Sequence, residues 1–518
     1  MQSLRERLLS SENIYHSIYL ANSYIQNKEL LSRKDLDLLY KLNDAFNKEI
    51  IEETISNVHK RITEILDNES DYFHVLVYFK PKKYENNKTI FRPLHTASLI
   101  DQIAMIAMLQ ILVYDIDPGN GKLLPSELSR LIPSNFYGNR ISYNGTELFK
   151  PWQEQYHEYT STANDRLSSY SETSEYKYEV SLDLTDFFPS INPQIVYNFI
   201  SSHLPLRLRE EDLHILKVAL KKLLIFDLCK LEPIELTWYL HKATKDIESS
   251  DKYVYAKGLP QGLPHTYFLA NLFMLVVKDQ YSSVFPGEML FYVDDSVIFT
   301  NGANGSLDEE TFKDAIAKLN ASIRRQEEAL LQLYSTEQIL PNNYCYEATE
   351  FGVTVHEANT KSVFSSIVDA HRGSGEMYLR SLSRETSNIG FDMYSALSDA
   401  ELKMLLSRTE TIINALKKEL VRIQATAPSS KVYRDKLLRY KKYFSYRHTI
   451  LKHRCTGDII ALKEEVINAI SRRENEFRID RFFCFTLTTF LHLQLHIHFV
   501  SVPRRISNPL ICFPQFKC

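Results

Sequence analysis

Two adjacent aspartates, Asp294 and Asp295, lie between two short apolar runs in the stretch MLFYVDDSVIF at residues 289–299. The runs are β-branched or aromatic and bounded by polar residues, so each predicts a buried strand. The acids then fall at a tight turn between antiparallel strands. Adjacent carboxylates repel each other, and bound divalent cations offset that cost. The pair can therefore hold Mg²⁺ for in-line attack on a phosphate, although a hairpin with a solvated turn is the alternative reading of this stretch alone.

A third carboxylate comes from the segment YEVSLDLTDFFPSINP at residues 178–193. We expect a strand over 179–184 with Asp183 near its end, and prolines at 189 and 193 that stop regular structure. On a strand beside the Asp294–Asp295 hairpin, Asp183 supplies the third oxygen ligand that a two-metal site needs.

The segment GLPQGLPHTYFLANLFM at residues 258–274 begins with a turn rich in glycine and proline and continues as an apolar helix. Gln261 and Gly262 stand just before that helix. Glycine has no side chain, so such a turn can approach a flat nucleobase or a sugar closely. A plain loop-to-helix junction is the alternative.

Basic residues gather in a predicted hairpin upstream. We expect a strand over 75–79, a basic turn with Lys82 and Lys83, and a second short strand that ends near Arg92. Arginine offers a forked donor and lysine a point charge, which suits a triphosphate. A solvated hairpin is the alternative.

The remaining pattern divides the chain of 518 residues into three parts, 1–70, 71–385 and 386–518. Apolar residues at helical spacing predict helices over 1–70, 98–113 and 308–333, and again from 399 onward. The span 194–252 is also predicted to be helical and to form an insertion. A strand is expected over 350–355, with Lys361 after the turn that follows it.

Composition limits the class of protein. Hydrophobic content of 44% and charged content of 24% are those of a globular protein. The net charge of −4 provides no overall attraction to nucleic acid, so any such surface must be a local patch. The six cysteines include no CxxC pair, which fits a reducing cytosol. Residues 482–503 include no Asp, Glu, Lys or Arg, and we interpret them as a buried helix or strand pair of the C-terminal domain rather than a membrane span.

Two candidate nucleic-acid contacts follow from local charge. Residues 431–454 hold nine lysines and arginines, one aspartate and four tyrosines, a mixture suited to phosphates and stacked bases. The residues singled out there are Arg434, Arg439, Lys441 and Lys442. A turn at 138–139 precedes a fifth basic residue, Arg140. A basic solvated helix with tyrosines in the core is an equally good reading of the C-terminal run.

The segments SLDLTDFF, GLPQGLPHTYFLANL and FYVDD stand in the order of motifs A, B and C of reverse transcriptases, which they resemble. GVTVHEANTKS resembles motif D. The resemblance covers roughly residues 70–370. It implies an α+β fold with reverse-transcriptase-like fingers and palm, followed by an all-α C-terminal domain of helical-repeat type.

The resemblance also assigns roles. Metal binding and catalysis are implied for Asp183, Asp294 and Asp295, with the Leu184 carbonyl as a backbone ligand. Phe188 matches the steric gate that excludes a 2′-hydroxyl, and Gln261 matches a residue near the incoming base and sugar. Arg92 with Lys82 or Lys83 matches the triphosphate clamp. Lys361 matches the proton donor to pyrophosphate.

Within that superfamily, FYGNRIS, LFKPWQEQYHEY and the helical C-terminus resemble bacterial abortive-infection polymerases of the AbiK and Abi-P2 types. This implies cytoplasmic phage defence by untemplated DNA synthesis from dNTPs, primed by a tyrosine hydroxyl and supported by two Mg²⁺, with Mn²⁺ as the alternative ion. It also implies single-stranded DNA attached to the protein, a homo-oligomer and no membrane. The priming residue is not identifiable among the 31 tyrosines.

Two other functions fit parts of the sequence. The same motifs suit a templated RNA-dependent DNA polymerase of the kind found in retrons. However, Leu263-Pro264-His265 replaces the usual small, serine-containing stretch, which favours untemplated synthesis. Arg447 and His453 have the R-x5-H spacing of HEPN ribonuclease toxins, a pair that arises easily in a basic run.

Overall fold

The computed structural model describes residues 3–450 with gaps, and residues 451–518 lie outside the described part. The gaps are 25–29, 86–87, 118, 120, 206–207, 241–254, 303–304, 334–336, 342–343, 345–353, 356–361, 373–398, 427–432, 434–435, 438, 442, 445–446 and 448–449. The chain divides into two units, Met1–Gly390 and Phe391–Cys518. Helices predominate over small sheets, which confirms the coarse α+β class.

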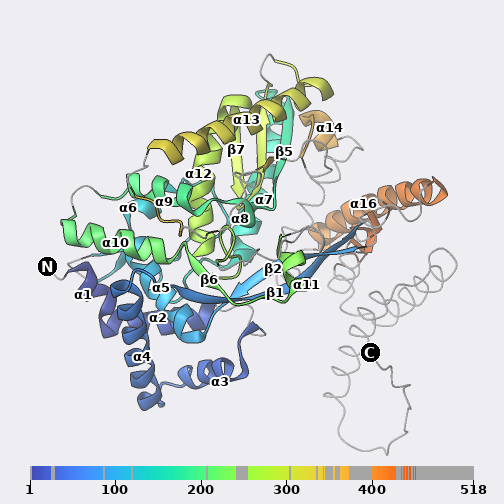
Figure 1. Cartoon of the computed structure of the whole chain (residues 1–518). Coiled ribbons are helices and arrows are strands. Elements are labelled where there is room, and N and C mark those ends of the chain that lie inside the picture. The colour runs from blue at the N-terminus through green and yellow to red at the C-terminus, as the bar shows by residue number, and fades with distance from the viewer. Residues whose placement is uncertain are drawn as a thin grey trace, which may run out of the picture. The chain divides into compact units, whose positions relative to one another are not determined.

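Helices form the N-terminal part of the first unit, as predicted for residues 1–70. The first, second and fourth of them pack around a fifth helix, α5 (Leu99–Val113), which is buried along almost its whole length, and the third packs on the fourth (Figure 1). Ser98 caps α5 by accepting the backbone N–H of Asp101. The first four helices are α1 (Leu4–Leu9), α2 (Ser11–Tyr24), α3 (Arg33–Leu42) and α4 (Lys48–Asp67).

The predicted basic hairpin forms, but its strands are longer than expected. They are β1 (Phe73–Glu85) and β2 (Lys88–Thr96), so Lys82 and Lys83 lie in a strand and not in the turn. The prediction ended the first strand early because the basic, polar residues after Phe79 were expected to form a turn. The register shifts between Pro81 and Lys83, and such an irregularity accommodates a proline within a strand.

The span 194–252 was predicted to be helical, and among its described residues this is wrong at 226–228, whereas 206–207 and 241–252 lie outside the described part. Between its helices lies the strand β6 (Phe226–Leu228), which pairs in parallel with β1. Three residues give too little local pattern to predict a strand, and the distant pairing partner decides it. The helices around β6 are α9 (Pro193–Ser202), α10 (Glu210–Lys222) and α11 (Pro233–Leu240).

A second sheet, here called the central sheet, carries the aspartates. Its strand order is β10-β5-β8-β7, and β9 pairs with the end of β5. The strands expected over 179–184 and on both sides of the Asp294–Asp295 pair are confirmed. Their bounds are β5 (Tyr178–Thr185), β7 (Gly287–Tyr292), β8 (Asp295–Thr300), β9 (Thr354–Val355) and β10 (Val363–Ser366).

Each face of the central sheet packs on its own helices. Val180, Leu182 and Ile298 point into the large core that also contains residues of α12 (Thr266–Val284) and α13 (Glu309–Leu333). Leu290, Val297 and Phe299 point the other way, into a smaller core with α7 (Trp152–Thr173) and α14 (Ile367–Arg372). Figure 1 shows the central strands among these helices. Short connecting elements are β3 (Tyr114–Ile116), β4 (Leu123–Pro125), α6 (Glu127–Leu131) and α8 (Phe187–Ser190).

In the second unit, α16 (Asp399–Thr426) confirms the helix predicted to begin at 399. Ion pairs join it to the basic run, from Glu419 to Lys436 and from Glu410 to Arg447, the latter at 3.2 Å. Among the described residues, no helix is both long and apolar enough to cross a membrane. Residues 482–503 lie outside the described part.

Candidate active site at the end of the central sheet

Strand register brings two of the three predicted acids face to face. Asp183 on β5 lies directly opposite Asp295 on β8, which in turn lies opposite Tyr292 on β7. Side chains of directly opposed residues share one face, with Cβ atoms about 4.5–5.5 Å apart. Asp183 is buried, whereas Asp295 is exposed. Asp294 occupies the two-residue turn before β8, so the three acids lie at one end of the sheet.

The pKa of a buried tyrosine hydroxyl near the acids responds to the charges of all three. Tyr281 on α12 is fully buried, and burial raises its pKa. The negative charges of Asp294, Asp183 and Asp295 raise that pKa further. All three carboxylates therefore lie close enough to one point in the core to act on it together.

The turn that carries Asp294 has an unusual backbone. Val293 has φ of 59°, a left-handed conformation that is rare for a β-branched residue. A Cβ atom built on Gly138 would lie 2.7 Å from Val293 Cγ2, so only glycine fits against the turn at this position. Backbone strain of this kind persists where the surroundings hold it in place.

The segment 135–139 supports the outer strand of the hairpin. Backbone N–H groups of Tyr137 and Phe291 donate to the carbonyls of Phe291 and Asn135, each at 2.9 Å. Beneath this segment, the buried Asn271 amide donates to the Gly138 carbonyl at 2.8 Å. The predicted turn at 138–139 is confirmed, since Asn139 has φ of 54°.

On the other side of Asp183, its backbone N–H donates to Ser362 Oγ at 3.4 Å. Ser362 immediately follows Lys361, which lies outside the described residues. Leu184 pairs with Val355 of β9, and the role predicted for its carbonyl stays a prediction.

Phe188 is held in place by close backbone contacts with the loop that contains Gly258 and Leu259. Its carbonyl accepts the N–H of Leu259 at 2.9 Å, and a Cβ atom on Gly258 would lie only 2.4 Å from that same oxygen. The Phe188 ring meets Tyr267 edge-on, with centroids 5.7 Å apart. Phe188 is therefore buried and held in place by these contacts.

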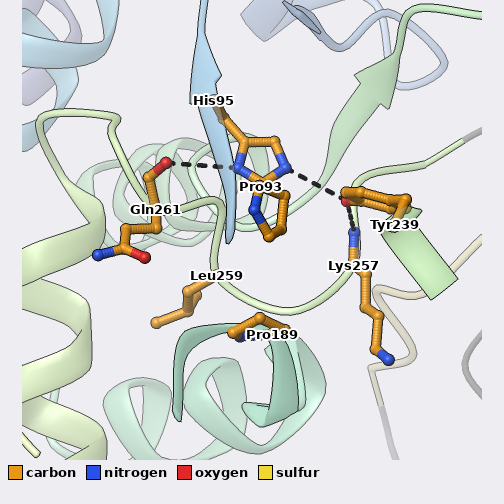
Figure 2. A pocket seen from close by; sticks show the side chains of 7 residues that line it. All are labelled: Pro93, His95, Pro189, Tyr239, Lys257, Leu259 and Gln261. Carbon is orange, nitrogen blue, oxygen red and sulfur yellow. Dashed lines mark hydrogen bonds between the residues drawn. The ribbon is translucent and has the colours of Figure 1, made fainter. Parts of the chain in front are cut away.

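Gln261 uses its main chain to join the same loop to β2. Its carbonyl accepts the backbone N–H of His95 at 2.8 Å, and a Cβ atom on Gly262 would lie 2.4 Å from the His95 carbonyl. The Gln261 side chain extends away from His95 (Figure 2). A small pocket at this junction is lined by Pro93, His95, Pro189, Tyr239, Lys257, Leu259 and Gln261.

His95 is neutral in this junction, because burial lowers its pKa to about 4. The Gln261 carbonyl faces His95 Nδ1 at 3.4 Å and can only accept, which places the proton of the neutral imidazole on Nδ1. Nε2 is then an acceptor for the Tyr239 hydroxyl at 3.2 Å, and that hydroxyl oxygen accepts the backbone N–H of Lys257 at 2.8 Å. Figure 2 shows this chain of hydrogen bonds.

The predicted triphosphate residues are described in part. Arg92 is exposed on β2, and its positive charge lowers a Tyr267 pKa that burial raises. Arg92 and Phe188 thus share Tyr267 as a neighbour. The side chains of Lys82 and Lys83 lie outside the described part of the structure.

The predicted nucleic-acid contacts remain predictions. The Arg140 guanidinium donates to the carbonyls of Ile132 and Pro133 at 3.0 and 2.7 Å, and burial lowers its pKa. Arg439 and Lys441 are half-buried within a helix. Arg434 and Lys442, like His453 of the ribonuclease alternative, lie outside the described residues.

The three acids are the candidate metal ligands at this end of the sheet. In the part of the chain that the structure describes, no three histidine, cysteine or acidic side chains come together as a metal cluster. The acids nevertheless suit Mg²⁺ by chemistry, because carboxylate oxygens are its preferred ligands and a cation would offset the repulsion between opposed carboxylates.

Several supporting residues have no sequence signal of their own. His95, Tyr239 and Ser362 are single residues without a motif. Asn271 could have been noticed, since an amide in an otherwise apolar helix must find a partner when buried. Neither protein-family models nor curated proteins give a match to this chain.

Proposed function

We propose that this protein is a DNA polymerase of the reverse transcriptase superfamily that acts in phage defence, without a template and with a tyrosine hydroxyl as primer. The observation that carries the proposal is the register of β5 and β8, with Asp183 opposite Asp295 and Asp294 in the adjoining turn. This is the arrangement of acids that nucleotidyl transfer requires, and it supports a reverse-transcriptase-like palm.

In this reading, Asp183, Asp294 and Asp295 hold Mg²⁺, with Mn²⁺ as the alternative. When bound, the ions neutralise phosphate charge and stabilise the attacking and leaving oxygens. The chain's own residues position the nucleotide. Phe188, fixed by Leu259 and Tyr267, packs on the sugar and excludes a 2′-hydroxyl.

Positive charge for the triphosphate comes from Arg92 together with Lys82 or Lys83. Lys361 is the proposed proton donor to pyrophosphate, and Ser362 places its neighbourhood next to Asp183. Gln261 contributes its side chain to the base and sugar, since its main chain is engaged by His95.

The experiment uses the full chain with Mg²⁺ and each labelled dNTP, without primer or template, followed by a denaturing gel. We expect label that stays with the denatured protein and resists nuclease only at its root. Asp294→Ala should abolish it. The control is Asp279→Ala, which removes an exposed aspartate of α12 in the same unit.

Two outcomes oppose the proposal. Incorporation that begins only when RNA template and primer are added indicates a templated RNA-dependent DNA polymerase. Incorporation that never occurs, or that survives Asp294→Ala, removes the polymerase assignment itself.

A further inference from the structure

The row of residues that contains the acids continues into an aromatic cluster. Asp183, Asp295 and Tyr292 are opposed across three strands, so they share the face of the central sheet that also carries Leu290 and Val297. Farther from the acids on that face, α7 and α14 cover the sheet. A nucleic-acid strand that reaches the acids on this face therefore passes the end of α7.

That end of α7 is aromatic. Tyr156 meets Tyr292 edge-on with ring centroids 5.1 Å apart, and Tyr159 lies 5.6 Å from the same ring. The Tyr292 hydroxyl is 3.5 Å from the main-chain oxygen of Trp152, the first residue of the helix. Tyr159 is buried, Tyr156 and Tyr292 are half-buried, and the Trp152 side chain is 54% exposed.

The charges around this cluster are mostly negative, apart from the exposed Lys150 just before α7. The exposed neighbours on α7 are Gln153, Glu154 and Glu158, none of them positive. Base faces therefore suit contact with nucleic acid here better than phosphates do. Aromatic side chains bind bases in this way with little sequence preference, because every base has a π-face.

We propose that Trp152, Tyr156 and Tyr292 form a stacking surface for the bases at the 3′ end of single-stranded DNA. The inference rests on the proposed function, which places a growing DNA end beside Asp295. The surface holds that end between successive additions. An enzyme without a template has no paired strand to hold it, so base stacking takes over that task.

The tryptophans provide a direct test. The chain has two, and Trp238 lies between Phe79 and Phe91 of the β1–β2 hairpin. A Trp238→Phe protein therefore reports on Trp152 alone. We expect its fluorescence to be quenched by a short oligothymidylate in Mg²⁺ without dNTPs. Adding Tyr156→Ala should weaken the affinity about tenfold.

Polymerisation gives the second measurement. With Trp152→Ala, we expect unchanged addition of the first nucleotide but much shorter products, whereas Trp152→Phe restores most of the length. The control is Phe46→Ala, which removes an aromatic side chain that is 92% exposed before α4.

The two measurements separate the inference from the function on which it rests. Quenching without any DNA synthesis supports the stacking surface and removes the polymerase proposal. DNA synthesis without quenching, or with full-length products from Trp152→Ala, overturns the stacking surface and leaves the polymerase in place.

Discussion

The turn that carries Asp294 and the loop that carries Gln261 both contain left-handed backbone, but they place different residue types in it. Both need residues in the left-handed region. The loop uses glycines, Gly258 with φ of 65° and Gly262 with φ of 118°, and each presses against the main chain of another segment. The turn uses Val293, and the glycine stands across from it, at position 138.

The loop is rigid without backbone strain, whereas the turn is strained. The loop relaxes into its conformation and is fixed by contacts with β2 and α8, so it can hold Phe188 in place. The turn keeps a valine in a costly conformation next to the acids. Strained residues of this kind cluster at functional sites. Substitutions at these positions test whether the loop and the turn differ in this way.

The largest effect is expected at the loop. Gly262→Ala places a methyl group 2.4 Å from the His95 carbonyl, a main-chain atom that cannot swing aside. Strain and overpacking together should lower the free energy of unfolding by about 4 kcal/mol, measured by urea unfolding. Gly145→Ala is the matched control, because φ there is +77° but no atom lies within 4 Å. It should cost about 1 kcal/mol. Equal losses would mean that close contact does not fix the loop.

Because His95 is buried and neutral, the free energy of unfolding should depend on pH. Its folded pKa of about 4 lies below the ordinary 6.5, so the unfolded chain takes up the proton first as pH falls. The contribution of His95 to stability should therefore be complete above pH 6.5 and decline by about 3 kcal/mol down to pH 4. His95→Gln keeps a donor and an acceptor but does not titrate, so its loss over this range should be smaller by that amount. Urea unfolding at each pH measures it.

Parallel pH curves for the wild type and the glutamine variant would contradict this account. His265 does not confuse the comparison, although burial also lowers its pKa, to about 3. It contributes the same pH dependence to both proteins.

Sequence predicted much of the central sheet because its signals are local. Short apolar runs around Asp183 and Asp294 define strands, and the spacing of polar residues defines the turn. The helix of residues 99–113 was equally clear, because it is apolar on every side. Function could be suggested from the order of these segments alone.

The remainder depends on contacts between distant segments. Nothing near Phe226 indicates that three residues pair with β1 and form a strand. The junction of His95, Tyr239 and Gln261 joins three parts of the chain that share no spacing pattern. Gly138 predicted a turn correctly, but its main role is to leave room for Val293, a contact that no local pattern encodes.

A smaller effect is expected where Gly138 meets the turn. Gly138→Ala should cost about 2 kcal/mol and reduce dNTP incorporation, because its Cβ would overlap Val293 Cγ2. Val293→Ala removes that methyl group. In the double variant the cost of the alanine at 138 should largely disappear. A double-mutant cycle on stability and incorporation measures the coupling, and additive losses would show that the two residues do not press on each other.

The smallest change in stability is expected from Val293→Gly. Relief of the left-handed strain favours the variant by about 1–3 kcal/mol. The greater freedom of glycine in the unfolded chain costs about 0.5–1 kcal/mol, and the contact with Gly138 is lost. The free energy of unfolding should therefore stay within about 1 kcal/mol of the wild type in urea. Incorporation should nevertheless fall, because Asp294 is then attached to a flexible turn. Undiminished incorporation would mean that Val293 is tolerated at the turn without helping to position the acids.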